Sequence, residues 1–298
     1  MARRRTGLTL NGWLVIDKPT GMTSGDVVNR VRRLTRAAKV GHAGTLDPLA
    51  TGVLPLAFGE ATKCMDLLMG SSKCYRFTLR WGVATDSDDS EGQETGQSPV
   101  RPAAAEVAAA LPDFTGHIEQ VPPAFSAIKV AGRRAYDLAR QGAAPALAAR
   151  TVRIDRFTHL GGIDADHADF EVVCGKGTYM RALARDLGQC LGSLAHIVAL
   201  RRTRVGPFVE QAAISLDKLA EVCDTTAAIE SLLPIETALA DIPALVLTGV
   251  QADRLRCGQA IHVLNAADGI AYATNGNVPV ALTKVSGGEV QPVRVFNL

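Results

Sequence analysis

The chain has 298 residues, of which 47% are hydrophobic and 21% charged, which is enough apolar material for a sizeable core and a second, smaller domain. Basic and acidic side chains nearly balance overall, but residues 1–204 carry 27 basic against 20 acidic groups and residues 205–298 carry 5 against 10. The composition excludes a disordered chain, and no segment approaches the roughly 20 apolar residues of a membrane span, which excludes a transporter.

The six cysteines lie far apart and form no CxxC pair, and no apolar signal segment follows the basic residues Met1 to Arg5. This pattern excludes a disulfide scaffold and a zinc ribbon. It predicts reduced thiols and a cytoplasmic location.

The first two predicted elements are a strand and a cationic helix. Residues 12–17 (GWLVID) are typical of a strand that ends at Lys18-Pro19. A helix begins near Thr23 or Ser24, and its apolar residues fall at helical spacing, so that the cations between residues 29 and 39 point largely outward. These cations are Arg30, Arg32, Arg33, Arg36 and Lys39.

Residues 75–83 (YRFTLRWGV) alternate with period two and predict a strand with Tyr75 and Phe77 on one face. An acidic segment, residues 86–94, follows directly. Its spacing misses the EF-hand pattern, so a solvated loop is favoured over a calcium site.

From residue 102 onward, predicted strands and helices alternate until the chain becomes acidic after Pro207. The basic, proline-containing segment 122–149 predicts an insertion with a mobile tip. After Pro207 the chain is acidic and predicted to be helical to about residue 239, and a domain boundary is predicted near residue 240. The other predicted helices are 102–111 and 178–192, and the predicted strands are 151–157, 169–174, 197–205, 244–247, 278–285 and 290–296.

Residues 41–54 (GHAGTLDPLATGVL) place His42, Thr45 and Asp47 between glycines and must turn tightly. By itself, an aspartate before a proline is most simply a turn initiator. The segment GKGT at 175–178 lacks the spacing of a Walker phosphate loop, and the six histidines are scattered singly, so that no metal site is predicted.

Residues 41–52 closely resemble the catalytic motif of the TruB family of tRNA pseudouridine synthases, which convert the uridine at position 55 of the T arm. Four further blocks occur in the family's order, and five ordered blocks make the resemblance specific. They are LVIDKPTGMTS at 14–24, KCYR at 73–76, GKGTYMRALARDL at 175–187 and LRRTRVGPF at 200–208. One departure is Ala43, where the family commonly has threonine or glycine, and its small side chain still permits the turn.

The resemblance implies that Asp47 is the catalytic aspartate, which attacks the uridine at the ribose or at the base ring. A carboxylate suits this role because it is ionised at neutral pH and can form a covalent adduct or take a proton. The resemblance further implies that Arg181 pairs with Asp47, and that Tyr75 stacks on the target base and takes part in proton transfer at carbon five. Without the resemblance, Arg181 could be an exposed helical residue and Tyr75 an ordinary strand residue.

Further residues are implied to bind the substrate. His42 would occupy the space left when the target base rotates out of the T loop, which offsets an unstacking cost of a few kcal/mol. Tyr179 and Leu200 would form pocket walls, and Lys18 would support the turn at Asp47.

The basic runs could form a track for RNA phosphates, with residues 129–140 in the family's mobile RNA-clamping insertion. The candidate RNA-binding residues are Arg30, Arg33, Lys129, Arg133, Arg134 and Arg202.

The implied architecture is the α+β pseudouridine synthase fold, a mixed and mainly antiparallel sheet flanked by helices. The catalytic domain would span residues 1–240, with the clamping insertion at about 122–150, and a small β-rich PUA-like domain would span 241–298. No metal or cofactor, a tRNA partner, no required protein partner and a monomeric state are implied. Two alternatives remain open: a tRNA-folding chaperone that acts without chemistry, and a guide-RNA-dependent pseudouridine synthase subunit.

Overall fold

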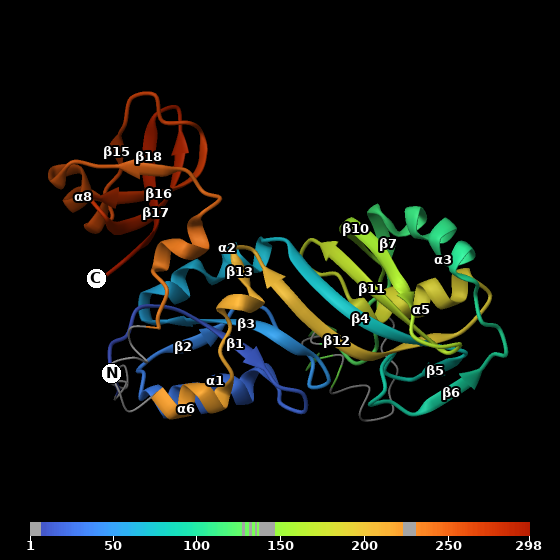
Figure 1. The fold of residues 1–298 in the computed structure, drawn as a ribbon. Coiled ribbons are helices and arrows are strands. Elements are labelled where there is room, and N and C mark those ends of the chain that lie inside the picture. The colour runs from blue at the N-terminus through green and yellow to red at the C-terminus, as the bar shows by residue number, and fades with distance from the viewer. Residues whose placement is uncertain (1–6, 127–128, 131–132, 135, 137–146, 223–230) are drawn as a thin grey trace.

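The computed structural model describes residues 7–126, 129–130, 133–134, 136, 147–222 and 231–298, and Figure 1 shows its fold. A nine-stranded sheet runs in the order β1-β3-β12-β4-β11-β10-β7, with β2 added to β3 and β13 to β12. All its pairings are antiparallel except that of β3 with β12. Its strands are β1 (Gly12–Lys18), β2 (Val40–His42), β3 (Thr51–Phe58), β4 (Lys73–Trp81), β7 (Gly116–Gln120), β10 (Arg150–Gly162), β11 (His167–Cys174), β12 (Ala195–Val205) and β13 (Phe208–Val209).

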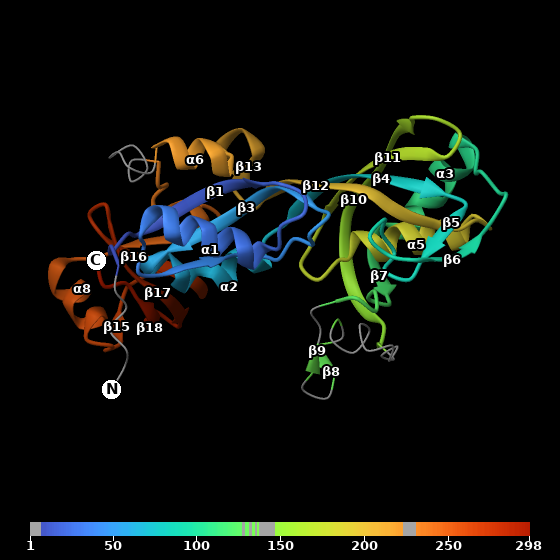
Figure 2. The same cartoon turned by 90° about the horizontal axis from the view of Figure 1, so that it is seen from below.

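Helices and short hairpins accompany this sheet, and the expected mixed, mainly antiparallel α+β fold is confirmed. The helices are α1 (Ser24–Thr35), α2 (Met65–Gly70), α3 (Ala104–Ala110), α5 (Met180–Cys190) and α6 (Leu216–Val222), with 3-10 turns η1 (Gly59–Cys64), η2 (Leu111–Phe114), η3 (Glu210–Ala212) and η4 (Ile235–Leu239). The hairpins are β5 (Val83–Thr85) with β6 (Glu94–Gln97), and β8 (Lys129–Val130) with β9 (Arg133–Arg134). In Figure 2 the β8–β9 hairpin lies below the sheet.

The long strands β4 and β12 join two groups of elements. Figure 1 shows β1, β2, β3 and α1 on one side of these strands, and β7, β10, β11, α3 and α5 on the other. Residues 41–52 run from β2 into the start of β3, and residues 175–187 lead into α5 and form most of it. The two central strands therefore bring the motifs together from opposite halves of the molecule.

Apolar alternation explains the central strand. The β4 side chains alternate between buried and more exposed positions from Tyr75 to Trp81, and Phe77 and Leu79 join Phe170 of β11 in the main core. The rings of Phe77 and Phe170 stack at a centroid distance of 5.4 Å. The predicted strand is therefore confirmed, although Gly82 separates β5 from β4.

The prediction of an acidic helix from Pro207 to about residue 239 is confirmed only in part, because the described residues form one short helix here and not a continuous one. The described part of this segment forms β13, η3, the short helix α6 and η4, and residues 223–230 lie outside the described residues. The physical reason is burial: Phe208 packs against Trp13, and Ile235 and Leu239 join the same cluster. Because these apolar residues pack against the cluster that contains Trp13, the segment forms several short elements in place of one long helix.

The C-terminal residues form a separate five-stranded sheet in the order β14-β16-β17-β18-β15 with its own apolar cluster. Its strands are β14 (Ala244–Val246), β15 (Ile261–His262), β16 (Gly269–Asn275), β17 (Val278–Ser286) and β18 (Glu289–Val295), and its helix is α8 (Gly249–Arg256). The three short strands predicted here are confirmed, whereas β15, β16 and α8 were not predicted. No helix in the described residues has the length and apolar character needed to span a bilayer.

Candidate active site

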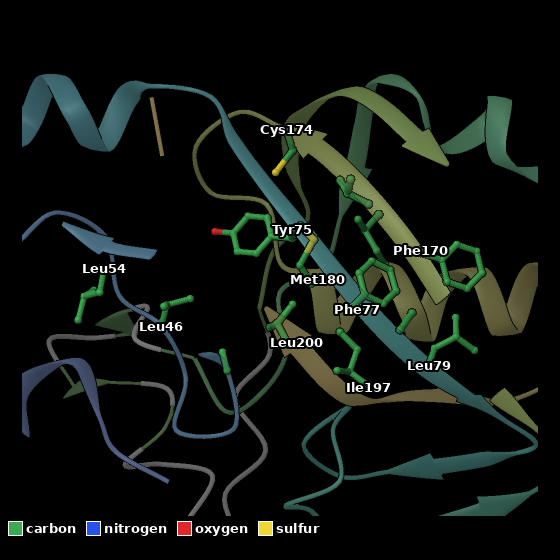
Figure 3. Packing of buried hydrophobic residues seen from close by; sticks show 14 of the residues in the cluster. Leu46, Leu54, Tyr75, Phe77, Leu79, Phe170, Cys174, Met180, Ile197 and Leu200 are labelled. Atoms are coloured by element: carbon green, nitrogen blue, oxygen red, sulfur yellow. The ribbon is translucent and has the colours of Figure 1, made fainter. Parts of the chain in front are cut away.

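A pocket of about 440 Å³ lies where the loop before β3 meets β4, β12 and the start of α5. Asp47, Tyr75, Tyr179, Arg181 and Leu200 all line it. Figure 3 shows the Tyr75 ring directed away from Phe77 and Leu79, toward the side on which Leu46 and Leu54 lie. Five of the seven residues predicted to act in catalysis or substrate binding therefore meet in one pocket.

The Asp47 turn is held by hydrogen bonds from residues 18–24, which run from the end of β1 to the start of α1. The Ser24 hydroxyl accepts from the Leu46 amide at 2.8 Å and donates to the Leu46 carbonyl at 3.1 Å. The Gly21 amide and the Lys18 ammonium both donate to the Pro48 carbonyl, at 2.8 and 3.2 Å. These bonds fix the backbone on both sides of Asp47, so the carboxylate is presented by a rigid turn.

Asp47 forms an ion pair with Arg181 across the pocket. Arg181 Nη2 lies 3.0 Å from Asp47 Oδ2, and the arginine side chain is 6% exposed whereas that of Asp47 is 38% exposed. Arg181 also donates to the carbonyl oxygens of Ser87 and Phe125 at 2.9 and 2.8 Å. A buried guanidinium held in this way fixes the orientation of the Asp47 carboxylate at the pocket surface.

The prediction that residues 86–94 form a solvated loop is wrong for two of its carboxylates. Asp89 is buried and its Oδ2 lies 3.4 Å from Arg181 Nη1, while Asp88 pairs with Arg185 at 2.9 Å. The Ser87 hydroxyl and the Glu91 amide donate to Asp89. Burial raises the pKa of Asp88 to about 6, and the nearby guanidinium of Arg185 opposes this rise.

The sequence analysis did not identify Asp88 and Asp89 as partners of the α5 arginines, although the spacing of those arginines indicates such partners. Arg181 and Arg185 are four residues apart and therefore share one face of α5. Asp88 and Asp89 are the adjacent carboxylates that meet this face. A pair of arginines at this spacing requires acidic partners when their helix face is buried.

Tyr75 is buried and borders the same pocket. Burial raises the pKa of its phenol, while the Arg202 guanidinium and a hydrogen bond with it act in the opposite direction. The hydroxyl is therefore protonated at neutral pH, and the ring can serve as an apolar face with a polar tip.

The other predicted substrate-binding residues divide into two groups. Tyr179 lines the pocket, and the Gln120 side chain holds its backbone by accepting from its amide at 2.8 Å and donating to its carbonyl at 3.1 Å. Lys18 and His42 do not line this pocket. Lys18 donates a hydrogen bond to the Pro48 carbonyl. Burial lowers the pKa of His42, and the charge of Arg202 lowers it further.

The predicted RNA-binding residues occupy different places. Arg30 and Arg33 line an open hollow of about 940 Å³ along α1, and Arg30 pairs with Asp217 at 3.4 Å. Lys129, Arg133 and Arg134 belong to the backbone of the β8–β9 hairpin. Much of the predicted insertion at 122–150 lies outside the described residues.

Arg202, which is predicted to bind RNA, lies in the pocket and not on the surface with Arg30 and Arg33. Arg202 is 1% exposed and lines the pocket, where Nε donates to the Val53 carbonyl at 2.8 Å and Nη2 to the Gly44 carbonyl at 3.1 Å. Its position is dictated by β12, which runs beside β3 at this point. Within the described residues no group of three His, Cys, Asp or Glu side chains is arranged to hold a metal ion.

Comparisons with known proteins show the family of the chain. Residues 32–180 match the TruB family pseudouridylate synthase N-terminal domain, and residues 181–240 match the tRNA pseudouridylate synthase B C-terminal domain. The tRNA pseudouridine synthase B of Rhodospirillum rubrum is 52% identical over all of both chains, and that of Caulobacter sp. is 49% identical over all of both chains.

A solved structure described as a Cbf5-Nop10-Gar1 complex contains a similar chain, with a TM-score of 0.75 and 26% identity over 97% of this chain and 86% of that one. The chain therefore belongs to the TruB family of pseudouridine synthases, a class of isomerases.

Proposed function

We propose that this protein converts the uridine at position 55 in the T arm of tRNA to pseudouridine, with Asp47 as the catalytic carboxylate. The observation that carries the proposal is the ion pair between partly exposed Asp47 and buried Arg181, in a pocket bordered by Tyr75. Relatives named tRNA pseudouridine synthase B, about 50% identical over the full chain, support tRNA as the substrate.

In the proposed reaction, Asp47 attacks the uridine at C1′ of the ribose or at the base ring, and the bond between C1′ and N1 breaks. The detached base rotates, a bond forms between C1′ and C5, and the bond between Asp47 and the substrate breaks, which restores the free carboxylate. The proton on C5 leaves and N1 gains a proton, so the reaction is an isomerisation that requires no oxidant or cofactor. Arg181 forms an ion pair with Asp47 and would hold the carboxylate oriented toward the substrate during the reaction.

Tyr75 would stack on the flipped uracil and take part in proton transfer at C5. Its raised pKa supports a protonated phenol that donates a hydrogen bond rather than a free phenolate. Tyr179 and Leu200 would hold the base from other sides. His42, outside the pocket, would occupy the space that the base leaves, and Lys18 would hold the Asp47 turn.

The tRNA backbone would lie along cationic surfaces on both sides of the pocket. Arg30 and Arg33 on α1, and the hairpin that carries Lys129, Arg133 and Arg134, would contact its phosphates. We further propose that residues 1–240 form the catalytic domain and residues 241–298 a PUA-like RNA-binding domain. The protein would act in the cytoplasm as a monomer without a protein partner.

Asp47→Asn tests the proposal, because it keeps the size of the side chain and removes its charge. With unmodified tRNA transcript, tritium release from C5-labelled uridine should fall roughly 10⁴-fold or more, while the dissociation constant for tRNA changes little. Mapping of the pseudouridine should place it at position 55. Asp66→Asn, which removes an exposed carboxylate on α2, is the matched control and should retain full activity.

Pseudouridine formation by Asp47→Asn would contradict the catalytic role. Product at another position only would contradict the T-arm assignment. If the wild-type protein refolds tRNA without making pseudouridine, the chaperone alternative is correct. If activity appears only after a second RNA is added, the guide-dependent alternative is correct.

A further inference from the structure

Two buried cations line the pocket without a carboxylate partner. Lys73 is 7% exposed and Arg202 is 1% exposed. Lys73 Nζ donates to the carbonyl oxygens of Met69 and Ser71 at 2.8 and 2.7 Å, and Arg202 likewise donates to backbone carbonyls. Among the described residues, no carboxylate oxygen lies within ion-pair distance of either one, since the ion pairs at this pocket belong to Arg181.

A buried charge that faces only neutral dipoles is costly, and buried charges in proteins are normally paired. Asp47 is the one carboxylate among the described lining residues, and it is already paired with Arg181. The cations on the lining are Lys73, Lys176, Arg181 and Arg202. The pocket therefore has an excess of positive charge that an anionic part of its ligand would neutralise.

The two cations flank the residue proposed to hold the base. Lys73 precedes Tyr75 by two positions on β4, so both side chains lie on the same face, roughly 7 Å apart along the strand. Arg202 lies directly opposite Tyr75 in the β12–β4 register. In a nucleotide whose base stacks on Tyr75, the anionic group within this range is the phosphodiester.

Lys73 has a hydrogen-bond donor left over that could bind such a phosphodiester. The Lys73 ammonium has three protons, and its two carbonyl partners take two of them. A phosphate oxygen would complete its hydrogen bonding and supply the missing negative charge.

We propose that Lys73 and Arg202 form a phosphate subsite of this pocket, which holds a phosphodiester next to the target uridine. The subsite rests on the proposed function, because it assumes that a uridine in RNA enters the pocket. It would bind the target strand independently of base sequence and fix the ribose relative to Asp47.

The competing explanation for Lys73 is purely structural. Met69 and Ser71 lie at the end of α2, and a lysine that donates to carbonyls there caps the helix. A cap stabilises the fold but does not respond to the charge of an RNA phosphate. The experiment must therefore change the phosphate as well as the lysine.

The test uses the full-length protein with Asp47→Asn, so that RNA binds without turnover. Three T-arm hairpins each carry one neutral methylphosphonate: at the phosphate 5′ to the target uridine, at the phosphate 3′ to it, or at a distant stem phosphate. One of the two flanking substitutions should weaken binding about tenfold, and the distant one by much less.

In the protein that also carries Lys73→Met, the same flanking substitution should change affinity less than twofold. The salt dependence of binding to unmodified hairpin should fall by about 0.7 in slope, the value for one lost contact to a single strand. Lys218→Met, which removes a cation on α6 whose side chain is 64% exposed, is the matched control and should keep the tenfold sensitivity.

The proposal is overturned if neither flanking methylphosphonate weakens binding, a result that needs no lysine variant to fold. It is also overturned if Lys73→Met lowers the melting temperature but retains the full methylphosphonate effect, which identifies a helix cap only. Failure of the proposed function is recognised separately, as absence of pseudouridine when the wild-type protein acts on unmodified tRNA.

Discussion

Arg181 lies between two carboxylates of different exposure. Asp47 faces the pocket, whereas Asp89 is buried behind the guanidinium. Asp89 is itself held by Ser87 and the Glu91 amide, so it limits the positions that Arg181 can take. The orientation of the proposed nucleophile therefore depends on a residue that does not line the pocket.

Asp89→Asn should lower kcat by roughly 10-fold to 100-fold, because one buried charge-assisted contact to Arg181 is lost. KM for tRNA should change little, since Asp89 does not line the pocket. Steady-state kinetics measure both. Asp86→Asn alters an exposed carboxylate of the same segment and should leave kcat unchanged, and a rise in KM alone for Asp89→Asn would contradict the positioning role.

Burial lowers the pKa of both Lys18 and Lys73 to about 8. A phosphate binds the protonated lysine, so tRNA affinity should fall as pH rises through 8. Dissociation constants between pH 6.5 and 9 at constant salt should show this fall in the wild type and a smaller fall in Lys73→Met. An equal fall in both proteins would show that Lys73 does not contribute.

The lowered pKa values of these two lysines make the folded protein more stable as pH rises, whereas tRNA affinity falls. The unfolded chain has lysine pKa values near 10.5, so between pH 8 and 10.5 the unfolded state binds more protons than the folded state. The contribution of these two lysines to the free energy of unfolding therefore rises with pH in this window. Urea unfolding at pH 8 and 9.5, with Lys73→Met as reference, separates this contribution from other alkaline effects.

At the scale of elements, a parallel contact joins β3, which follows the Asp47 turn, to β12, which carries Leu200 and Arg202 of the pocket lining. Gly52 at the start of β3 pairs with Arg202 of β12 and has φ +98°. A Cβ atom at this position would lie 2.2 Å from the Arg202 carbonyl oxygen, so no other residue fits without moving a strand. The Asp47 turn and the β12 wall are thereby held against each other.

Gly52→Ala should lower the free energy of unfolding by about 2–4 kcal/mol, because it combines backbone strain with a clash against backbone. Activity should fall as well, since β12 carries Leu200 and Arg202 into the pocket. Chemical denaturation and tritium release measure the two effects. Gly249→Ala, at an open position with ordinary φ in the first turn of α8, is the control and should change stability by less than about 1 kcal/mol.

At the scale of the whole molecule, the C-terminal sheet is attached to the larger one by apolar and polar contacts. Leu282 and Phe296 join the buried cluster that contains Trp13. The Lys63 ammonium donates to the Val295 carbonyl at 2.6 Å, and the Asn297 amide donates to Glu60 at 2.7 Å. Because these contacts share one cluster, we expect the two sheets to unfold together.

Phe296→Ala should lower the free energy of unfolding by about 3–5 kcal/mol through the cavity that it leaves in this cluster. The loss should appear as a shift of one transition, followed by the fluorescence of Trp13 and Trp81 and by far-UV circular dichroism. Two separate transitions would contradict a shared core. Leu298→Ala, at an exposed position, should shift the midpoint very little.

The sequence by itself determined the elements whose signals are local. Apolar periodicity placed β1, α1, β4 and α5 within a few residues, because burial of one face imposes a period of two on a strand and about 3.6 on a helix. The ordered motifs identified the family and the members of the pocket, Asp47, Tyr75, Tyr179, Arg181 and Leu200.

Only the tertiary structure decided which charged residues are buried. Asp89 resembles its acidic neighbours in sequence and Arg202 belongs to a run of arginines, yet both are almost fully buried. Their burial depends on α5 and β3, which lie far away along the chain. Charge and local spacing do not encode such distant partners, because a buried ion becomes tolerable only when the fold supplies its counter-charge or hydrogen bonds.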